Sequence, residues 1–273
     1  HGDLYLNNII AWKNQPMVFD CLEFNESFRW TDTMADVGFL AMDLEDNYRS
    51  DYAYRFINQY METSGDYNGL VVLRFYQSYR AVVRAKIALF SHDIEKYTRY
   101  MDVAEQYTTV AKPALIIMHG VSGSGKSTRA KQLVEKLGAV QIRSDVERKR
   151  LVGLSSSSKT NSPVNQGIYT EAFNQKTYQR LLELADIILR SGYSVIVDAA
   201  FLNKQHRDGF AQLAKRQQVP FKISPCYLQE DELKKRLLSR VNDPSEACSH
   251  VVSMQLETIE ELNDEERRTL LND

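Results

Sequence analysis

The feature that most constrains the fold is an apolar run that leads directly into a glycine-rich turn. The stretch ALIIMHGVSGSGKST occupies residues 114–128, and its apolar part has the composition of a buried strand. The glycines that follow allow backbone conformations that other residues avoid. Apolar residues then recur at helical spacing until about residue 137. The order of strand, glycine-rich turn and helix predicts the start of an α/β domain.

The turn matches the pattern GxxxxGK[ST] in full. In this pattern successive backbone N–H groups and the N-terminus of the following helix surround phosphate oxygens. Lys126 is expected to contact the β- and γ-phosphates of ATP, and the Ser127 hydroxyl to ligate Mg²⁺. The alternative is a Gly/Ser-rich turn that only caps a helix. The predicted phosphate-binding residues are Gly120, Val121, Ser122, Gly123, Ser124, Gly125, Lys126, Ser127 and Thr128.

From Pro113 onward, strand-like and helix-like segments alternate, which predicts a mostly parallel sheet flanked by helices. Residues 1–111 lack this alternation and are mostly helical after two short strand-like segments. We therefore expect two domains, 1–111 and 112–273. The predicted strands are 114–119, 139–143, 194–198 and 221–227, and the predicted helices are about 125–137, 169–190, 204–216, 230–240 and 245–262.

Two carboxylates stand where predicted strands end. Asp198 closes the apolar stretch VIVD, where it is suited to orient Mg²⁺ or its waters, and a turn or helix-cap residue is the alternative. Ala199 follows it, so the Glu with which motor-type ATPases activate water is absent. Asp145 in QIRSDVERKRL could accept the proton of an acceptor hydroxyl, with Arg148 on the same face if a helix starts there. The alternative for this stretch is a solvated, charged helix start.

A pair of arginines, Arg236 and Arg240, lies four residues apart on a predicted helix. Placed over a triphosphate, they would neutralise the charge of the transferred group as part of a lid. A surface helix with Glu/Lys pairs is the competing interpretation.

In their order along the chain, LIIMHGVSGSGKST, IRSDVERKRL, VIVDAAFLNKQHRDGFAQLA and RLLSRVNDPSEA resemble the P-loop small-molecule and polynucleotide kinases. That group includes gluconate-kinase-like, zeta-toxin-like and polynucleotide 5′-hydroxyl kinase-like proteins with an AAA-type ATP-binding domain. The resemblance implies phosphoryl transfer from ATP without fixing the acceptor, and we expect the acceptor to be a hydroxyl of a small molecule. It implies that Asp145 is the acceptor-side base, Arg148 an acceptor contact, and Arg236 and Arg240 lid arginines.

The N-terminal region contains a second candidate site. His1-Gly2-Asp3 followed by Asn8 has the spacing HxDxxxxN, with an Asp for an acceptor hydroxyl and an Asn for Mg²⁺. Asp20 follows one hairpin later, where a second Mg²⁺-binding Asp would stand. The alternative is a polar turn that precedes a strand.

This region resembles the catalytic half of the aminoglycoside phosphotransferase-like family, in the form fused to a P-loop kinase domain, through FDCLEFNESFRWTDTMADVGFLAMDL and FYQSYRAVVRAKIA. The resemblance implies that Asp3 is a catalytic base and that Asn8 and Asp20 are metal ligands in a truncated protein-kinase-like C-lobe. Tyr5 stands at the position where this family usually has a second His. A lobe with a phosphate-binding lysine would have to precede residue 1, so we expect a fragment whose N-terminal half is inactive alone.

The composition limits which class of protein this chain can belong to. The formal net charge is −2, and no apolar run approaches the roughly 20 residues of a membrane span. Three scattered cysteines without a CxxC spacing favour a reducing compartment, so we expect a cytoplasmic protein. A nucleotide-dependent regulatory ATPase module is one alternative function. A polynucleotide 5′-kinase is another, for which Lys204 and Arg207 would add positive charge, although no long basic stripe is present.

Overall fold

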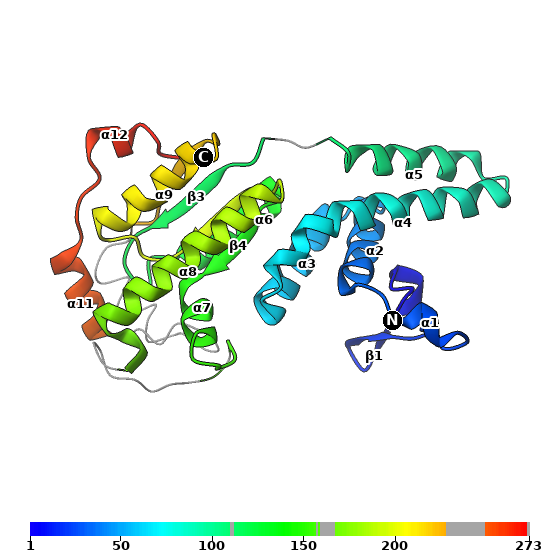
Figure 1. Cartoon of the computed structure of the whole chain (residues 1–273), viewed down its shortest axis with the longest axis horizontal. Helices are drawn as coiled ribbons and strands as arrows, with labels where there is room; N and C mark the ends of the chain where they lie inside the picture. The colour runs from blue at the N-terminus through cyan, green and yellow to red at the C-terminus, as the bar shows by residue number, and fades with distance from the viewer. Residues whose placement is uncertain (110–111, 157, 159–166, 228–248, 272–273) are drawn as a thin grey trace. The chain divides into compact units, whose positions relative to one another are not determined.

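The chain divides into two compact units (Figure 1). Unit 1 comprises His1–Met61 and Gly65–Ala111, and unit 2 comprises Glu62–Ser64 and Lys112–Asp273. The computed structural model describes residues 1–109, 112–156, 158, 167–227 and 249–271, with only the backbone described for 249–252. Each unit buries its own set of apolar side chains.

Unit 2 is built on a four-stranded parallel sheet. The strands β3 (Leu115–His119), β4 (Val140–Arg143), β5 (Val195–Asp198) and β6 (Phe221–Pro225) lie in the order β4-β5-β3-β6. Every residue of β3 and β5 is buried, as expected for the central strands of a parallel sheet covered on both faces. The predicted α/β fold is therefore confirmed, and the strand bounds differ from the predicted ones by at most two residues.

Helices cover the sheet of unit 2. α6 (Lys126–Leu137) packs on β3, β4 and β5, α8 (Glu171–Arg190) on β4 and β5, and α9 (Lys204–Arg216) on β3 and β6. α8 and α9 contact each other, so they lie on the same face of the sheet. Right-handed crossover connections between the parallel strands place α6 on the opposite face. The short helix α7 (Ser144–Arg150) follows β4 directly. A glycine-rich turn after a central strand of such a sheet is the arrangement of the P-loop NTPase fold.

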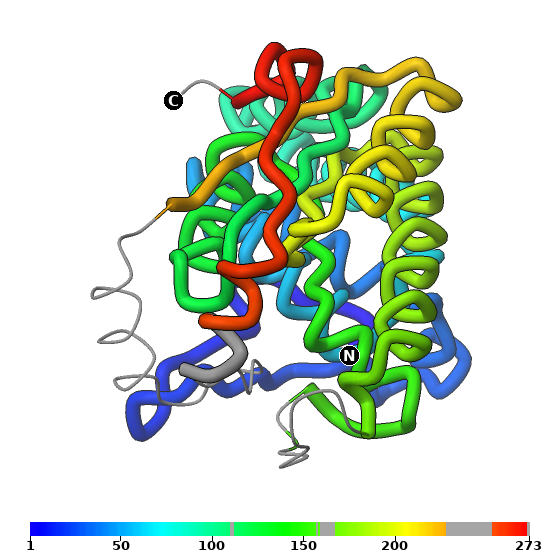
Figure 2. The backbone as a smooth tube through the Cα atoms, turned by 90° about the vertical axis from the view of Figure 1, so that its left-hand side faces the viewer, coloured from blue at the N-terminus to red at the C-terminus, as the bar shows by residue number. Residues whose placement is uncertain are grey.

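The C-terminal segment of unit 2 extends the sheet beside β6. After α11 (Ser249–Thr258) and α12 (Asp264–Arg267), Leu271 N donates to Ile223 O at 2.8 Å, and Ile223 N donates to Thr269 O at 3.0 Å. Figure 2 shows this segment in red. The predicted last helix ends earlier than expected, because Glu260 N donates to Leu202 O (3.0 Å) instead of continuing the helix. The predicted helix at 230–240 lies outside the described residues.

Unit 1 begins with a small antiparallel hairpin and continues as helices. β1 (Ile9–Trp12) pairs with β2 (Gln15–Val18), and Lys13 and Asn14 between them have positive φ angles of 50° and 60°, as in the tight turns that join twisted strands. The predicted helical character of this half is confirmed. Its elements are the 3-10 helices Leu6–Asn8 and Tyr67–Gly69 and the helices α1 (Glu26–Arg29), α2 (Thr33–Asp46), α3 (Ser50–Ser64), α4 (Leu70–Phe90) and α5 (Ile94–Gln106).

The core of unit 1 lies where α2, α4 and α5 meet. Its buried members are Phe39, Met42, Ala81, Ala85, Tyr100, Val103 and Ala104. Small alanines on α4 allow the larger side chains of α2 and α5 to pack closely. α5 ends at Gln106, because β-branched residues follow it and Pro113 disfavours helix in the residue before it.

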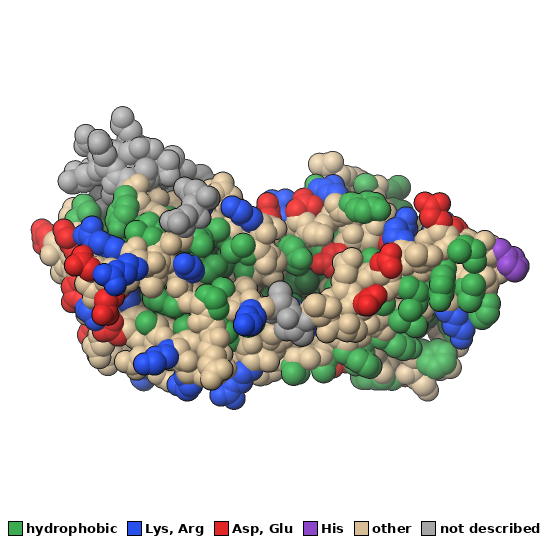
Figure 3. Space-filling view, turned by 90° about the horizontal axis from the view of Figure 1, so that it is seen from above, with side chains coloured by type: hydrophobic (Ala, Val, Ile, Leu, Met, Phe, Trp, Pro, Cys, Tyr) green, Lys and Arg blue, Asp and Glu red, His purple; other side chains and the backbone are tan. Residues whose placement is uncertain are grey.

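Apolar side chains also lie on the surface of unit 1, and Figure 3 shows them in green over its right-hand half. On α4 the exposed ones include Val71, Phe75, Tyr79, Val82 and Phe90. None of the helices in the described part of the chain is both long and apolar enough to span a bilayer.

Candidate functional site

The turn between β3 and α6 requires glycine at several positions. Gly120, Gly123 and Gly125 have φ angles of 144°, 88° and 93°. A Cβ atom on Gly120 would lie 2.3 Å from the carbonyl oxygen of Cys226, which leaves no room for a side chain. Gly125 caps α6 without a side-chain hydrogen bond, and the first turn of that helix contains no acidic residue. Its N–H groups are thus suited to bind an anion.

The ammonium group of Lys126 lies against the glycine-rich turn. Lys126 Nζ donates to the carbonyl oxygen of Val121 at 2.7 Å. Ser124, 5% exposed, has a buried Oγ without a hydrogen-bond partner in the described part of the chain. A positive charge and backbone N–H groups therefore meet at one point, as a bound phosphate requires.

Asp198 ends β5 at the edge of the sheet next to this turn. The Ser127 side chain lies near its carboxylate, and its Oδ2 accepts a hydrogen bond from Gln141 Nε2 at 3.0 Å. Arg143 Nε lies 3.6 Å from the same oxygen. The sequence alone did not indicate a role for Gln141 or Arg143. The sequence feature that could have indicated them is the alternation of these two polar residues with apolar ones in the short strand V-Q-I-R.

The charges around Asp198 act in opposite directions. Burial raises the pKa of the Asp198 carboxyl above its ordinary value, and nearby Asp145 raises it further, whereas Arg143, Lys126 and Ser127 lower it. A bound divalent cation would also favour the carboxylate. Mg²⁺ is usually held by one or two protein oxygens together with phosphate oxygens and waters, so Ser127 and Asp198 fit this metal. No group of three or more His, Cys, Asp or Glu residues suited to a metal occurs among the described residues.

Asp145 lies at the same edge of the sheet as Asp198. Arg143 pairs in register with Asp198, and Asp145 follows two residues later in the first turn of α7. The two carboxylates are close enough to affect each other electrostatically. Asp145 is only partly buried. It is therefore open to solvent while Asp198 is enclosed.

Arg148 is buried and held by protein groups. Its Nη1 donates to Ile168 O at 2.9 Å, its Nη2 donates to Asn174 Oδ1 at 2.7 Å, and the guanidinium lies 5.2 Å from the centre of the Tyr169 ring. Through these contacts Arg148 holds the segment 167–174 against α7. The described structure thus gives Arg148 a positioning role, and the acceptor contact stays a prediction.

One contact to the glycine-rich turn was not expected from the sequence. Ser122 N donates to the side-chain oxygen Oε1 of Gln255 in α11 at 2.7 Å. The two residues are 133 positions apart. Neither the composition nor the periodicity around Gln255 indicates this contact, because it depends on how the end of the chain folds back.

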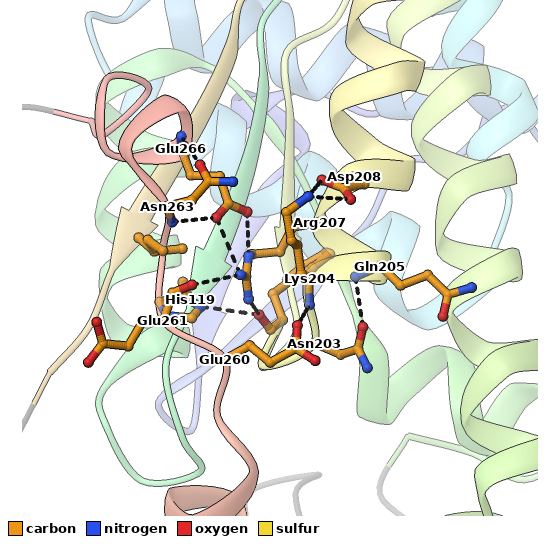
Figure 4. A network of polar contacts seen from close by, with 12 residues as sticks. His119, Asn203, Lys204, Gln205, Arg207, Asp208, Glu260, Glu261, Asn263 and Glu266 are labelled. Carbon is orange, nitrogen blue, oxygen red and sulfur yellow. Dashed lines mark hydrogen bonds and ion pairs between the residues drawn. The ribbon is translucent and has the colours of Figure 1, made fainter.

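A buried ion pair joins the end of the chain to the segment after Asp198 (Figure 4). Arg207 Nε donates to Glu266 Oε1 at 2.6 Å, and Arg207 Nη1 donates to the carbonyl oxygens of Phe201 and Leu202 at 3.1 Å each. Lys204 Nζ forms an ion pair with Asp208 at 2.6 Å. Arg207 is 1% exposed and its charge is paired with Glu266, so its guanidinium does not reach the surface. Lys204 is partly exposed, and its contribution of positive charge to a polynucleotide site stays a prediction.

His119 ends β3 beside the same network. Burial lowers the pKa of its imidazole, which favours the neutral ring, and its Nδ1 lies 3.1 Å from Phe201 O. The predicted lid arginines, Arg236 and Arg240, lie outside the described residues.

In unit 1, two residues of the predicted second site, Asp3 and Asn8, are in contact. Asn8 Nδ2 donates to the backbone oxygen of Asp3 at 2.9 Å and to Asp3 Oδ2 at 3.3 Å. Phe19 N donates to Asn8 O at 3.1 Å, which returns the chain toward its start. Burial raises the pKa of the Asp3 carboxyl above its ordinary value, and the negative charge of Asp20 raises it further. Arg80, Arg84 and Asn8 lower the same pKa.

Tyr5 and Gly2 have clear structural roles in this second cluster. The Tyr5 ring stacks on Phe39, with 5.2 Å between the ring centres and 8° between their planes. Gly2 has a φ of 85°, and its carbonyl oxygen accepts a hydrogen bond from Arg80 Nη2 at 2.7 Å. The HGD stretch is therefore fixed by α2 and α4 rather than being a free polar turn.

Residues 115–262 match the family of AAA domains designated AAA_33. The match covers more than half of the 273 residues and includes the glycine-rich turn and Asp198. The chain belongs to the AAA_33 family. The matched region lies within unit 2 and also contains Asp145 and Gln255.

Curated relatives of this AAA_33 chain are longer than the chain itself. It is 32% identical over 259 residues to uncharacterized protein Rv2004c of Mycobacterium tuberculosis (strain ATCC 25618 / H37Rv), covering 93% of this chain and 52% of the relative. Uncharacterized protein Mb2027c of Mycobacterium bovis (strain ATCC BAA-935 / AF2122/97) matches with the same values. The chain spans about half the length of the curated relatives it matches.

Solved structures resemble part of the AAA_33 chain. A gluconokinase from Sinorhizobium meliloti 1021 matches with a TM-score of 0.41 and 23% identity over 59% of this chain and 81% of that one. The Mycobacterium tuberculosis APS kinase CysC in complex with AMPPNP and APS matches with a TM-score of 0.37 and 22% identity, over 46% of this chain and 68% of that one.

Proposed function

We propose that unit 2 is an ATP-dependent phosphotransferase that moves the γ-phosphoryl group of MgATP to a hydroxyl of a small molecule. The observation that carries the proposal is the glycine-rich turn before α6, in which Gly120, Gly123 and Gly125 have positive φ angles and Lys126 Nζ lies against the Val121 carbonyl, with the Ser127 side chain near Asp198. These three side chains would hold the metal and the β- and γ-phosphates, while the backbone N–H groups of 120–128 surround them.

Asp145 is the proposed acceptor-side base. It lies at the same sheet edge as Asp198 and is partly exposed, so an acceptor hydroxyl can approach it. In the transfer the acceptor oxygen bonds to the γ-phosphorus, the bond to the β–γ bridging oxygen breaks, and ADP leaves. Asp145 takes the proton of the hydroxyl. The predicted lid arginines would stabilise the charge on the transferred group.

The first experiment measures binding and transfer separately. Isothermal titration with MgATP tests binding, and Lys126→Ala is expected to weaken it strongly, whereas Lys131→Ala, an exposed lysine on the same helix, leaves it unchanged. A transfer screen with labelled ATP then compares sugars, aminoglycosides, nucleosides and 5′-hydroxyl oligonucleotides. Asp145→Asn should abolish transfer and retain MgATP binding. ATP turnover that is indifferent to every acceptor and to Asp145→Asn would favour a regulatory ATPase module.

We also propose that unit 1 contains a kinase-like metal cluster formed by Asp3, Asn8 and Asp20, as its resemblance to the aminoglycoside phosphotransferase-like family implies. The supporting observations are that Asn8 Nδ2 donates to Asp3, that Asp3 is partly buried, and that the charge of Asp20 acts on Asp3. Mn²⁺ binding, followed by paramagnetic relaxation in an Asp198→Asn background, tests this proposal. Asp20→Asn should weaken the remaining binding, and Asp102→Asn, an exposed carboxylate in α5, should not. Equal binding in both variants contradicts the proposal.

A further inference from the structure

The peptide group between Val121 and Ser122 is held from both sides. Its carbonyl oxygen accepts a hydrogen bond from Lys126 Nζ at 2.7 Å, and its N–H donates to Gln255 Oε1 at 2.7 Å. In a trans peptide the C=O and N–H bonds point in opposite directions. Lys126 and Gln255 therefore form hydrogen bonds with opposite edges of the same peptide plane.

This arrangement makes the orientation of the plane dependent on Gln255. Rotation of this plane changes ψ of Val121 and φ of Ser122, the two soft backbone angles beside the peptide. If the plane turned over, the carbonyl of Val121 would point away from the Lys126 ammonium. The hydrogen bond to Gln255 opposes that rotation, because a flipped plane would direct the C=O toward the Gln255 oxygen.

We propose that Gln255 is a positioning residue for Lys126. By holding Ser122 N–H, it keeps the Val121 carbonyl in the orientation that places the ammonium of Lys126 for the β- and γ-phosphates. The inference rests on the proposed nucleotide site of unit 2. It also assigns a role to α11, since the position of this helix determines whether Gln255 reaches the turn.

The experiment is a double-mutant cycle on MgADP and MgATP affinity, measured by isothermal titration on the full chain. Gln255→Met keeps the length of the side chain but loses the acceptor oxygen. It should weaken both nucleotides about three- to tenfold, the effect of one hydrogen bond. In a Lys126→Met background, where no ammonium remains to be positioned, Gln255→Met should have no further effect. Gln212→Met, an exposed residue of α9, is the matched control and should not change either affinity.

The outcomes separate the inference from the proposed function. If the wild-type chain binds neither nucleotide, the proposed function fails, and the inference fails with it. If the wild type binds and Gln255→Met binds equally well, or if its effect persists in full beside Lys126→Met, only the inference is overturned. Should Gln255→Met not fold, Gln255→Glu provides the second measurement, because it retains an acceptor oxygen. The inference then requires that hydrogen exchange of the Ser122 amide stay as slow as in the wild type, and faster exchange would overturn it.

Discussion

Arg207 and Glu266, 59 residues apart, form a doubly hydrogen-bonded ion pair inside unit 2, with Nε–Oε1 and Nη2–Oε2 distances of 2.6 Å and 3.3 Å. Burial opposes ionisation of Glu266, but the hydrogen bonds from Arg207 and Asn263 outweigh it, and the pKa of the carboxyl lies below its ordinary value. The same guanidinium holds the carbonyl oxygens that follow Asp198. The ion pair thus ties the end of the chain to the edge of the sheet that carries the candidate site.

Breaking this ion pair should destabilise unit 2 strongly. Glu266→Gln leaves the buried Arg207 charge without its partner, and we expect a loss of about 3–5 kcal/mol in the free energy of unfolding. Urea denaturation followed by circular dichroism measures it. Arg216→Ala on the same helix removes an exposed ion pair with Asp186 and should cost about 0–1 kcal/mol. Similar losses in the two variants would contradict the structural role of Arg207.

Asp198→Asn should remove the effect of Mg²⁺ on nucleotide binding. The variant keeps the size of the side chain but loses the negative charge that would attract the cation next to Ser127. ATP affinity, measured with and without Mg²⁺, should change at least tenfold in the wild type and about twofold or less in the variant. Asp186→Asn, a partly exposed carboxylate on α8, is the control. An unchanged Mg²⁺ effect in Asp198→Asn would rule out this residue as part of the metal site.

Replacement of Gly120 and of Gly209 by alanine should change the stability of the protein in opposite directions. Gly120→Ala places a methyl group 2.3 Å from Cys226 O at a φ of 144°, so the turn must distort, and both stability and nucleotide affinity should fall. Gly209 lies inside α9, where the nearest atom to an added Cβ is 3.6 Å away. Gly209→Ala should therefore stabilise the protein by up to about 1 kcal/mol. Thermal unfolding measures both, and a tolerated Gly120→Ala would contradict the observed turn.

Acid should weaken the fold through His206. Burial lowers the pKa of this imidazole, whose ring stacks on Tyr178 with 3.7 Å between the ring centres, so the folded state disfavours the proton that the unfolded state accepts near pH 6.5. The contribution is present above pH 6.5 and is lost as the pH falls toward the lower folded value, by at most about 1.4 kcal/mol per pH unit. His206→Phe keeps the stacking and removes the titration. Its unfolding free energy should decline less than that of the wild type below pH 6.5, and parallel curves would contradict this explanation.

Much of the fold follows from local patterns in the sequence. The apolar runs at 115–119 and 195–198 form the central strands, and the helical periodicities correspond to α6, α8 and α9 within about two residues at each end. Helix ends were less predictable where a tertiary contact stops the helix, as at Thr258, where the following backbone bonds to Leu202. The sequence also did not indicate that Arg207 is buried, because a charged residue in a helix is exposed in most proteins.

The glycine-rich turn and its place between a strand and a helix could be predicted from local sequence, because the conformations of glycine and the Lys-Ser pair act over a few residues. The side chains that surround this turn could not, since they come from distant parts of the chain. Gln141 and Arg143 reach Asp198 through strand pairing, and Gln255 reaches Ser122 from 133 positions away. Such contacts depend on the packing of distant segments, which no local periodicity encodes.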